Sequence, residues 1–226
     1  MTKIKQKLLK KDFIEYLMFG LVLIFIIIHG IIRQEYFVAI ISALCGITYT
    51  AIAGKGHPIC YLFGITGSFF YSYLSFKNAL WGNLILYAGY YIPMQILGFF
   101  QWNKNLKKNS SIIVKTRLSN KLRLKYLFFT ILFSLICIFI MKYFSDSRPI
   151  LDGITTVFSI AGMYFTVKRC IEQWIAWMIV NTFSFLMWLI IALQGERVFS
   201  TVIMWGVYLV LAIYFYYQWK GDIAKS

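Results

Sequence analysis

Acidic residues are scarce in this 226-residue sequence, which has eight Asp and Glu against 23 Lys and Arg. Charged residues of both signs make up only 14% of the chain, whereas a typical soluble protein has about 25%. Hydrophobic residues make up 60%, more than a globule of this length can bury away from water. A lipid bilayer must therefore surround much of the chain. The net charge of +15 does not indicate a nucleic-acid partner, because the basic residues lie between long apolar runs.

Residue patterns for metal, redox or hydrolytic chemistry are missing. No two cysteines have C-x-x-C spacing, and His29 and His57 do not form a pair one helical turn apart. The sequence has no phosphate-binding loop of the Walker A type, no H-E-x-x-H motif and no plausible nucleophile–base pair. We therefore expect no cofactor, no metal site and no catalytic residue. The four cysteines are expected to be small apolar residues within or beside the apolar runs, at Cys45, Cys60, Cys137 and Cys170.

Long apolar runs are what the sequence has instead. Eight runs are each about long enough to cross a bilayer, which takes about 20 mostly apolar residues. They are Phe13–Ile32, Tyr36–Gly54, Ile59–Phe76, Leu80–Trp102, Tyr126–Phe144, Ile150–Val167, Ile171–Gln194 and Phe199–Trp219. The first run follows a basic segment, as in a signal peptide, but it is too long for one and no small-residue cleavage site follows it. We interpret it as a retained helix.

Basic residues are unevenly divided between the two sides that eight spans define. One side has both termini and the segments after the second, fourth and sixth spans, and it carries 18 of the 23 Lys and Arg. Because cytoplasmic loops are enriched in Lys and Arg, both termini are predicted to be cytoplasmic. Residues 103–125 contain eight Lys and Arg and no acid, and we expect this segment to anchor on anionic lipid headgroups.

A weak internal repeat relates two parts of the chain. The fourth run ends with Gly-Phe-Phe-Gln-Trp at Gly98–Trp102, and the eighth ends with Phe-Tyr-Tyr-Gln-Trp at Phe215–Trp219, 117 residues later. Spans two to four then recur as spans six to eight in the same orientation, as in SWEET-type sugar transporters. Such folds place the substrate between the halves, near the middle of the membrane. Alternatively, Gln-Trp is an interfacial anchor that arose twice by chance.

These features predict an all-α membrane protein of about eight transmembrane helices, with a 3+1+3 parallel repeat and an extra N-terminal helix. The expected divisions of the chain are a basic N-terminus with the extra helix (1–35), a first three-helix bundle (36–102), a basic cytoplasmic loop (103–125), a linker helix (126–149), a second three-helix bundle (150–219) and a cytoplasmic tail (220–226). The two bundles are the parts in which we look for a site.

The seventh run carries aromatic and amide residues on one helical face. Trp174, Trp177 and Asn181 open this face in the pattern W-x-x-W-x-x-x-N, and Ser184 and Trp188 continue it. An amide inside hydrocarbon needs a partner, so Asn181 is expected to point into the protein. Two indole rings beside an amide suit a flat, electron-poor ring, above all a cationic one. The alternative is an aromatic belt at the membrane interface, although a belt does not need an asparagine one turn deeper.

The fourth run has a second polar face. Tyr87, Tyr91 and Gln95 follow one another at intervals of four residues, and Asn83 lies higher on the same face. Pro93 interrupts the backbone hydrogen bonds between them and frees a carbonyl. These side chains could bind the hydroxyl groups of a sugar. Alternatively, they form hydrogen bonds between helices and nothing more.

No ionisable side chain lies in the middle of any run, because all eight acids are near span ends or in loops. Carriers driven by protons or sodium usually keep an ionisable residue inside the membrane, so we expect facilitated diffusion. A phosphate group would find no fixed cation along the pathway. The sequence therefore argues against a nucleotide as substrate and is compatible with its dephosphorylated form.

The W-x-x-W-x-x-x-N motif from Trp174 to Asn181, the segment Tyr87–Trp102 with its Pro93, and the 3+1+3 arrangement resemble the PnuC family of bacterial vitamin transporters. The resemblance covers roughly residues 36–219 and implies a homotrimer in the inner membrane, with one pathway in each protomer. It also implies facilitated uptake that phosphorylation inside the cell makes unidirectional. In this family the motif residues line the substrate pocket, which assigns that role to Trp174, Trp177 and Asn181.

The substrate is the least defined part of the resemblance. Family members carry nicotinamide riboside, thiamine, riboflavin or nucleosides, and the first two both present a cationic aromatic ring. Nicotinamide riboside is favoured because the tryptophan–asparagine motif is intact. Two other classes stay open: an intramembrane enzyme acting on a lipid-borne substrate, with only Glu172 and His57 as candidate groups, and a structural partner within a larger membrane complex.

Overall fold

The computed structural model describes residues 3–32, 34, 37–77, 84–143, 148–195 and 199–225, and every secondary-structure element named within them is a helix. The elements are α1 (Lys3–Ile32), α2 (Phe37–Lys55), α3 (Cys60–Lys77), a π-helix η1 (Ile85–Tyr91) that continues into α5 (Ile92–Asn103), α6 (Asn120–Tyr143), α7 (Pro149–Val167), α8 (Glu172–Leu193) and α9 (Phe199–Ala224). The predicted all-helical architecture is confirmed. Five of the described helices, α2, α6, α7, α8 and α9, are both long and apolar enough to span a membrane.

Three helices extend well beyond the apolar runs that predicted them. The first run began at Phe13, but α1 begins at Lys3. The expected linker helix began at Tyr126, but α6 begins at Asn120, and α9 continues past Trp219 to Ala224. The added first turns of α6 contain lysine, arginine and leucine, which favour helix and need not lie in hydrocarbon. The loop predicted at 103–125 is correspondingly shorter and runs from residue 104 to residue 119.

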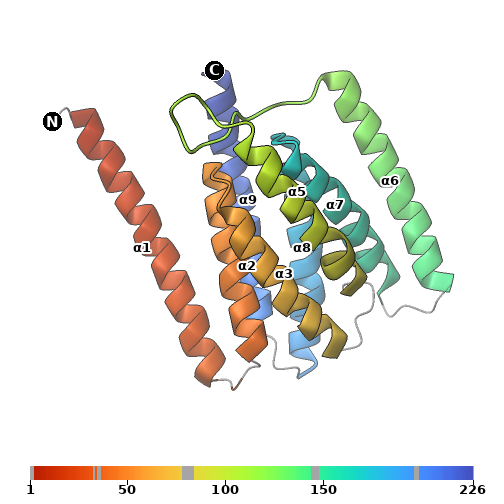
Figure 1. Ribbon diagram of the computed structural model, residues 1–226. Coiled ribbons are helices and arrows are strands. Elements are labelled where there is room, and N and C mark those ends of the chain that lie inside the picture. Colours follow the sequence, from red (N-terminus) through yellow and green to blue (C-terminus); the bar gives the residue numbers. More distant parts are fainter. Residues whose placement is uncertain are drawn as a thin grey trace.

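The helices α2, α3, α5, α7, α8 and α9 form a central bundle, with η1 continuing α5 (Figure 1). The red helix α1 stands at one edge, where it packs against α2 and α9, and the green helix α6 stands at the other edge against α7. Only 6% of the apolar stretch of α6 is buried, so most of that helix is available to lipid. Both ends of the chain lie on the same side of the bundle as the loop between α5 and α6 (Figure 1).

The basic loop 104–119 is folded against the bundle. Thr116 pairs with the turn between α7 and α8, accepting a backbone hydrogen bond from Ile171 and donating one to Arg169, both of 2.9 Å. Ile113 is fully buried against the α2–α3 turn, and its amide donates to the Gly56 carbonyl at 3.0 Å. The expectation that this segment only anchors on lipid headgroups is therefore incomplete, because part of it packs on protein.

Lys115 ties the same loop to the end of α9. Its ammonium group lies 2.5 Å from a carboxylate oxygen of Asp222 and 4.9 Å from the centre of the Trp219 ring. The Lys115 side chain is only 5% exposed, and burial lowers the pKa of its ammonium group while Asp222 opposes that shift. The loop, α9 and the α2–α3 turn thus form one connected cap over this end of the bundle.

The Gln-Trp sequences that suggested a repeat make matching contacts. The Trp102 indole N–H donates to the carbonyl of Thr166 at 2.9 Å, and the Trp219 indole N–H donates to the carbonyl of Gly54 at 2.7 Å. Thr166 and Gly54 are each the penultimate residue of their helices, α7 and α2. In each case, the third helix of one half is bonded to the first helix of the other. Equivalent contacts of this kind are expected if the two halves are repeats of one unit. The repeat itself stays a prediction.

Candidate functional site

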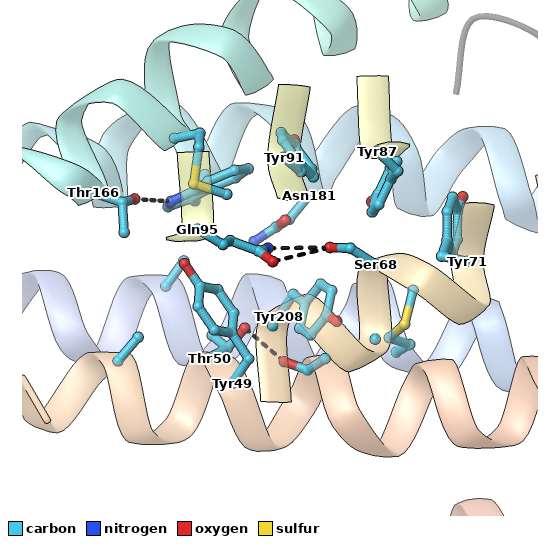
Figure 2. A pocket seen from close by; sticks show the side chains of 18 of the residues that line it. Tyr49, Thr50, Ser68, Tyr71, Tyr87, Tyr91, Gln95, Thr166, Asn181 and Tyr208 are labelled. Carbon is cyan, nitrogen blue, oxygen red and sulfur yellow. Dashed lines mark hydrogen bonds between the residues drawn. The ribbon is translucent and has the colours of Figure 1, made fainter. Parts of the chain in front are cut away.

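A cavity with an empty volume of about 770 Å³ lies inside the central bundle (Figure 2). The helices α2, α3, α5, α7, α8 and α9 and the π-helix η1 all contribute to the walls. The lining residues are Ser42, Gly46, Tyr49, Thr50 and Ala53 from α2; Gly64, Gly67, Ser68 and Tyr71 from α3; Tyr87, Tyr91 and Gln95 from η1 and α5; Met163 and Thr166 from α7; Gln173, Trp174, Trp177 and Asn181 from α8; and Met204, Trp205, Tyr208 and Ala212 from α9.

Small residues on α2 and α3 make the room for this cavity. Ser42, Gly46 and Thr50 are four residues apart along α2 and therefore share one face. The absence of a side chain at Gly46 is needed for close approach, because a Cβ there would lie 1.8 Å from the Tyr208 hydroxyl oxygen. At Gly64, a Cβ would lie 2.8 Å from the Tyr49 ring. The glycines let two tyrosine rings lie flush against the opposing helices.

A row of aromatic rings forms one wall. Tyr71 stacks on Tyr87 with ring centroids 4.3 Å apart, and Tyr87 meets Tyr91 edge-on at 4.6 Å. Tyr91 in turn meets Trp177 edge-on at 6.2 Å, so the row crosses from α3 through η1 to α8. These are the separations at which aromatic pairs attract one another. The wall offers ring faces and edges to any flat solute in the cavity.

The π-helix η1 places the tyrosines of this wall. The amide of Ile92 donates to the carbonyl of Tyr87, five residues earlier, which is the π-helical pattern. Pro93 follows directly and has no N–H with which to restore the α-helical bond. Tyr87, Tyr91 and Gln95 nevertheless all face the cavity, as their spacing predicted. Single π-turns of this kind are frequent at functional sites.

Two side-chain amides occupy the centre of the cavity. The Gln95 amide nitrogen donates to the Ser68 hydroxyl at 3.1 Å, which joins α5 to α3. The Asn181 amide comes from the opposite helix, α8, and points toward Gln95 (Figure 2). Both side chains are 3% exposed, and that of Asn181 has no hydrogen-bond partner among the described residues. An amide left in this way can donate to and accept from a bound solute.

Of the other hydrogen-bond donors around the cavity, one already has a partner in the protein and three have none among the described residues. The Trp177 indole N–H donates to the Thr166 hydroxyl at 3.0 Å, which fixes the plane of that ring. The indole N–H groups of Trp174 and Trp205 and the hydroxyl of Tyr49 are buried without a partner among the described residues. Because a buried donor without a partner costs free energy, these three groups favour a solute or water molecules that accept hydrogen bonds.

None of the described residues that line the cavity is ionisable at neutral pH as an acid or a base. The cavity can therefore hold a neutral solute, or a single positive charge against ring faces, without pairing it to a fixed charge. An anionic group would be buried with no cation to compensate it, which is costly. Among the described residues, no cluster of His, Cys, Asp or Glu could hold a metal ion.

The predicted site residues separate into three groups. Six of the nine line the cavity: Trp174, Trp177, Asn181, Gln95, Tyr91 and Tyr87. Ser184 and Trp188 are buried but lie outside the lining, because α8 continues past the cavity into the packed core, where Trp188 meets the edge of Tyr71 at 6.5 Å. Their inclusion rested on helical face alone, which does not tell where a cavity ends. Asn83 lies outside the described residues.

The sequence reasoning named no site residue in α2, α3, α7 or α9, although all four helices line the cavity. Tyr208 had a signal, because it lies 117 residues after Tyr91 in the repeat offset, and both residues line the cavity. The faces of α2 and α3 had a weaker signal in their small and hydroxyl residues at helical spacing. Gln173 and Trp205 had none, since single polar or aromatic residues near span ends are typical of interfacial anchors.

A bundle of apolar helices around an uncharged internal cavity is the architecture of a multi-pass membrane transporter. The family described as "Nicotinamide mononucleotide transporter" matches residues 36–221. The chain belongs to that family, in which the PnuC transporters are found. The helix α1 precedes the matched residues.

Relatives support this membership along most of the chain. A protein of Neisseria mucosa described as "Nicotinamide riboside transporter PnuC" is 26% identical over 200 residues, which are 86% of this chain and 76% of that protein. A protein of Haemophilus influenzae with the same description is 27% identical over 197 residues, 85% of this chain and 83% of that protein. The crystal structure of a vitamin B3 transporter PnuC matches with a TM-score of 0.83 and 25% identity, covering 94% of this chain and 92% of its own.

Proposed function

We propose that this protein takes up nicotinamide riboside across the bacterial inner membrane by facilitated diffusion. The observation that carries the proposal is the uncharged cavity between the two halves, lined by aromatic rings and amides. The substrate named in the descriptions of the two relatives fits this chemistry. It has a flat, cationic ring that carries an amide, and a sugar that carries hydroxyl groups.

The cavity favours the riboside over the mononucleotide that appears in the family's description. The mononucleotide differs by a phosphate, which would add negative charge to the solute. None of the described lining residues is a lysine, an arginine or a histidine, so that charge would have no partner in the cavity. Burial of an unpaired charge costs several kcal/mol, which is enough to exclude the nucleotide from a site of modest affinity.

Each part of the riboside has a complementary group in the cavity. Trp177 and Tyr91 offer ring surface to the cationic pyridine ring, a contact worth about 1–2 kcal/mol when water is excluded. Asn181 is placed to pair with the carboxamide, which needs a group that both donates and accepts. Gln95 and Ser68 on the facing helices are suited to the ribose hydroxyls.

The sites of Asn181 and its neighbour Thr182 allow a matched test of binding. Asn181→Ala removes the unpaired amide and should weaken binding of nicotinamide riboside by about 1–3 kcal/mol. Thr182→Ala alters an exposed residue on the other face of α8 and should bind as the unaltered protein does. Calorimetry on purified protein should be run with nicotinamide riboside, its mononucleotide, thiamine and riboflavin. Equal binding by both variants refutes the site, and tighter binding of thiamine reassigns the substrate.

In this proposal, phosphorylation of the substrate inside the cell determines the direction of transport. With no group among the described lining residues that is charged at neutral pH, the carrier equilibrates its substrate, and intracellular phosphorylation makes uptake unidirectional. Proteoliposomes without an ion gradient should therefore exchange labelled for unlabelled riboside at the same rate as energised ones. A rate that rises with a proton or sodium gradient contradicts uncoupled transport. We further propose that the chain functions as a homotrimer with a separate pathway in each protomer.

A further inference from the structure

A second, larger cavity lies at the edge of the bundle, away from the substrate cavity. Its empty volume is about 1,330 Å³, and α6, α7, α8, α9 and the end of the basic loop bound it. It exists because α6 packs along α7 and is joined to α8 by the Arg123–Glu172 ion pair near the start of both helices. We call it the α6 cleft. None of its lining residues belongs to the substrate cavity.

The interior of the α6 cleft is apolar. Leu127 of α6, Phe158 of α7, and Ile175 and Ile179 of α8 line it. The side chains of Leu127 and Ile175 are 49% and 44% exposed, so the cleft is open toward the lipid. The hydroxyl of Thr130 in the same wall donates to the backbone carbonyl of Tyr126 at 2.7 Å, so its proton is not available to a ligand. This interior suits hydrocarbon and offers little to a polar solute.

The mouth of the α6 cleft is basic. Arg117, Arg123 and Lys220 line it, and the only acid among its lining residues is Glu172. Glu172 is 8% exposed and is held by the Arg123 guanidinium at 2.6 Å and by the amide of Leu118. Arg117 and Lys220 form no ion pair with an acid that the structure describes. Two positive charges at the mouth are thus left for a ligand.

We propose that the α6 cleft binds an anionic phospholipid, with the phosphate at Arg117 and Lys220 and the acyl chains along α6 and α8. The cleft has the two features that an anionic phospholipid needs, which are a basic mouth for the phosphate and an apolar interior, open to the bilayer, for the acyl chains. Basic pockets between transmembrane helices are suited to anionic headgroups, and each cation near the surface contributes about as much as a severalfold gain in affinity. The lipid would fill the space that separates α6 from α8 and α9.

Native mass spectrometry tests this proposal. The protein is purified in a neutral detergent and exposed to equal amounts of phosphatidylglycerol and phosphatidylethanolamine. We expect one tightly retained phosphatidylglycerol per protomer. In the double variant Arg117→Gln, Lys220→Gln its occupancy should fall about tenfold. The control Lys104→Gln, Lys108→Gln loses the same charge from exposed sites on the same loop that do not line the cleft, and it should retain the lipid.

A second variant separates a lipid from a free phosphate or a protein partner. Ile175→Trp fills the apolar part of the cleft and keeps its charges, so it should also lose the lipid. Glycerol phosphate, which has the headgroup chemistry without acyl chains, should not compete. The proposal is overturned if the two glutamine double variants retain the lipid equally, if phosphatidylethanolamine is retained as well as phosphatidylglycerol, or if blocking the cleft changes only the number of protomers in the assembly.

Discussion

Thr166 is a residue whose effect on the substrate would be indirect. Its hydroxyl accepts the Trp177 indole N–H at 3.0 Å and donates to the Gly162 carbonyl at 2.8 Å, so it holds the ring in one plane. Thr166→Val keeps the shape and leaves the indole N–H unpaired. Riboside binding should weaken by about 1 kcal/mol, or about fivefold, in a calorimetric titration. Thr166→Ser restores the hydroxyl and should restore affinity. If serine and valine behave alike, the hydroxyl does not position the ring.

Gly46 is expected to set the width of the cavity. A Cβ there would lie 1.8 Å from the Tyr208 hydroxyl oxygen and 3.1 Å from the adjacent ring carbon, so Gly46→Ala must displace the tyrosine. Such overpacking costs about 1–3 kcal/mol, and we expect riboside affinity to fall about tenfold. Gly20→Ala is the matched control, because a Cβ at Gly20 meets nothing within 4 Å and brings the same gain in helix propensity. Comparable affinity in the two variants would show that the cavity tolerates the methyl group.

At the residue scale, the sequence predicted the α8 part of the cavity better than the rest. Trp174, Trp177 and Asn181 were found because an amide between indoles inside an apolar run has few structural explanations. Tyr49 and Tyr71 were not found, because a lone tyrosine in an apolar helix is equally consistent with packing between helices. Their position depends on how α2 and α3 turn relative to the other half, which is a matter of tertiary packing that periodicity does not contain.

At the scale of helices, Trp102 and Trp219 allow a test of whether the two predicted halves are equivalent. Both rings are fully buried, and each donates to a carbonyl at the end of a helix in the other half. Trp102→Phe and Trp219→Phe each remove one hydrogen bond to a buried carbonyl, although the Thr166 carbonyl keeps the Arg169 amide as a donor at 2.9 Å. Each should lower the free energy of unfolding by about 1–3 kcal/mol, and by similar amounts if the halves are equivalent. Thermal unfolding in detergent measures the loss.

Trp205→Phe is the control for this pair of substitutions. Its indole N–H is buried without a partner among the described residues, so the substitution removes the same atoms and breaks no hydrogen bond within that part of the chain. It should therefore cost less than either of the others. A large loss at Trp102 with none at Trp219 would argue that the Gln-Trp sequences are unrelated anchors, which was the alternative interpretation of the sequence.

At the element scale, the existence of the helices was predictable and their local deviations were not. Apolar length determined where spans occur, because a bilayer imposes one length on all of them. The π-helix at Ile85–Tyr91 depends on one extra residue in the turns before Pro93, and the spacing of the tyrosines alone does not reveal it. The packing of loop 104–119 was also hidden, since the eight basic residues of segment 103–125 indicated an anchor on lipid headgroups, whereas the side chains of Ile113 and Lys115 are buried against protein.

At the scale of the whole molecule, orientation in the membrane connects the sequence to the proposed uptake. The termini and the loop 104–119 lie on one side of the bundle (Figure 1), and that side carries 18 of the 23 Lys and Arg. By the positive-inside rule this side should face the cytoplasm. A fluorescent protein fused after Ser226 should then fold and fluoresce. Alkaline phosphatase fused after Gly195, in the turn at the far end of α8, should be active because it reaches the periplasm.

Exchanging the two reporters provides the control for orientation. Alkaline phosphatase after Ser226 should be inactive, and a fluorescent protein after Gly195 should stay dark if it is exported unfolded. Neutralising the five basic residues in loop 104–119 should raise phosphatase activity at Ser226, because these charges are part of the bias that holds that side in the cytoplasm. The reverse pattern in the unaltered chain would place the loop, its Lys115–Asp222 contact and the basic mouth of the α6 cleft outside the cell. The anionic surface of the cytoplasmic leaflet would then be unavailable to that mouth, and the lipid proposal would lose its electrostatic basis.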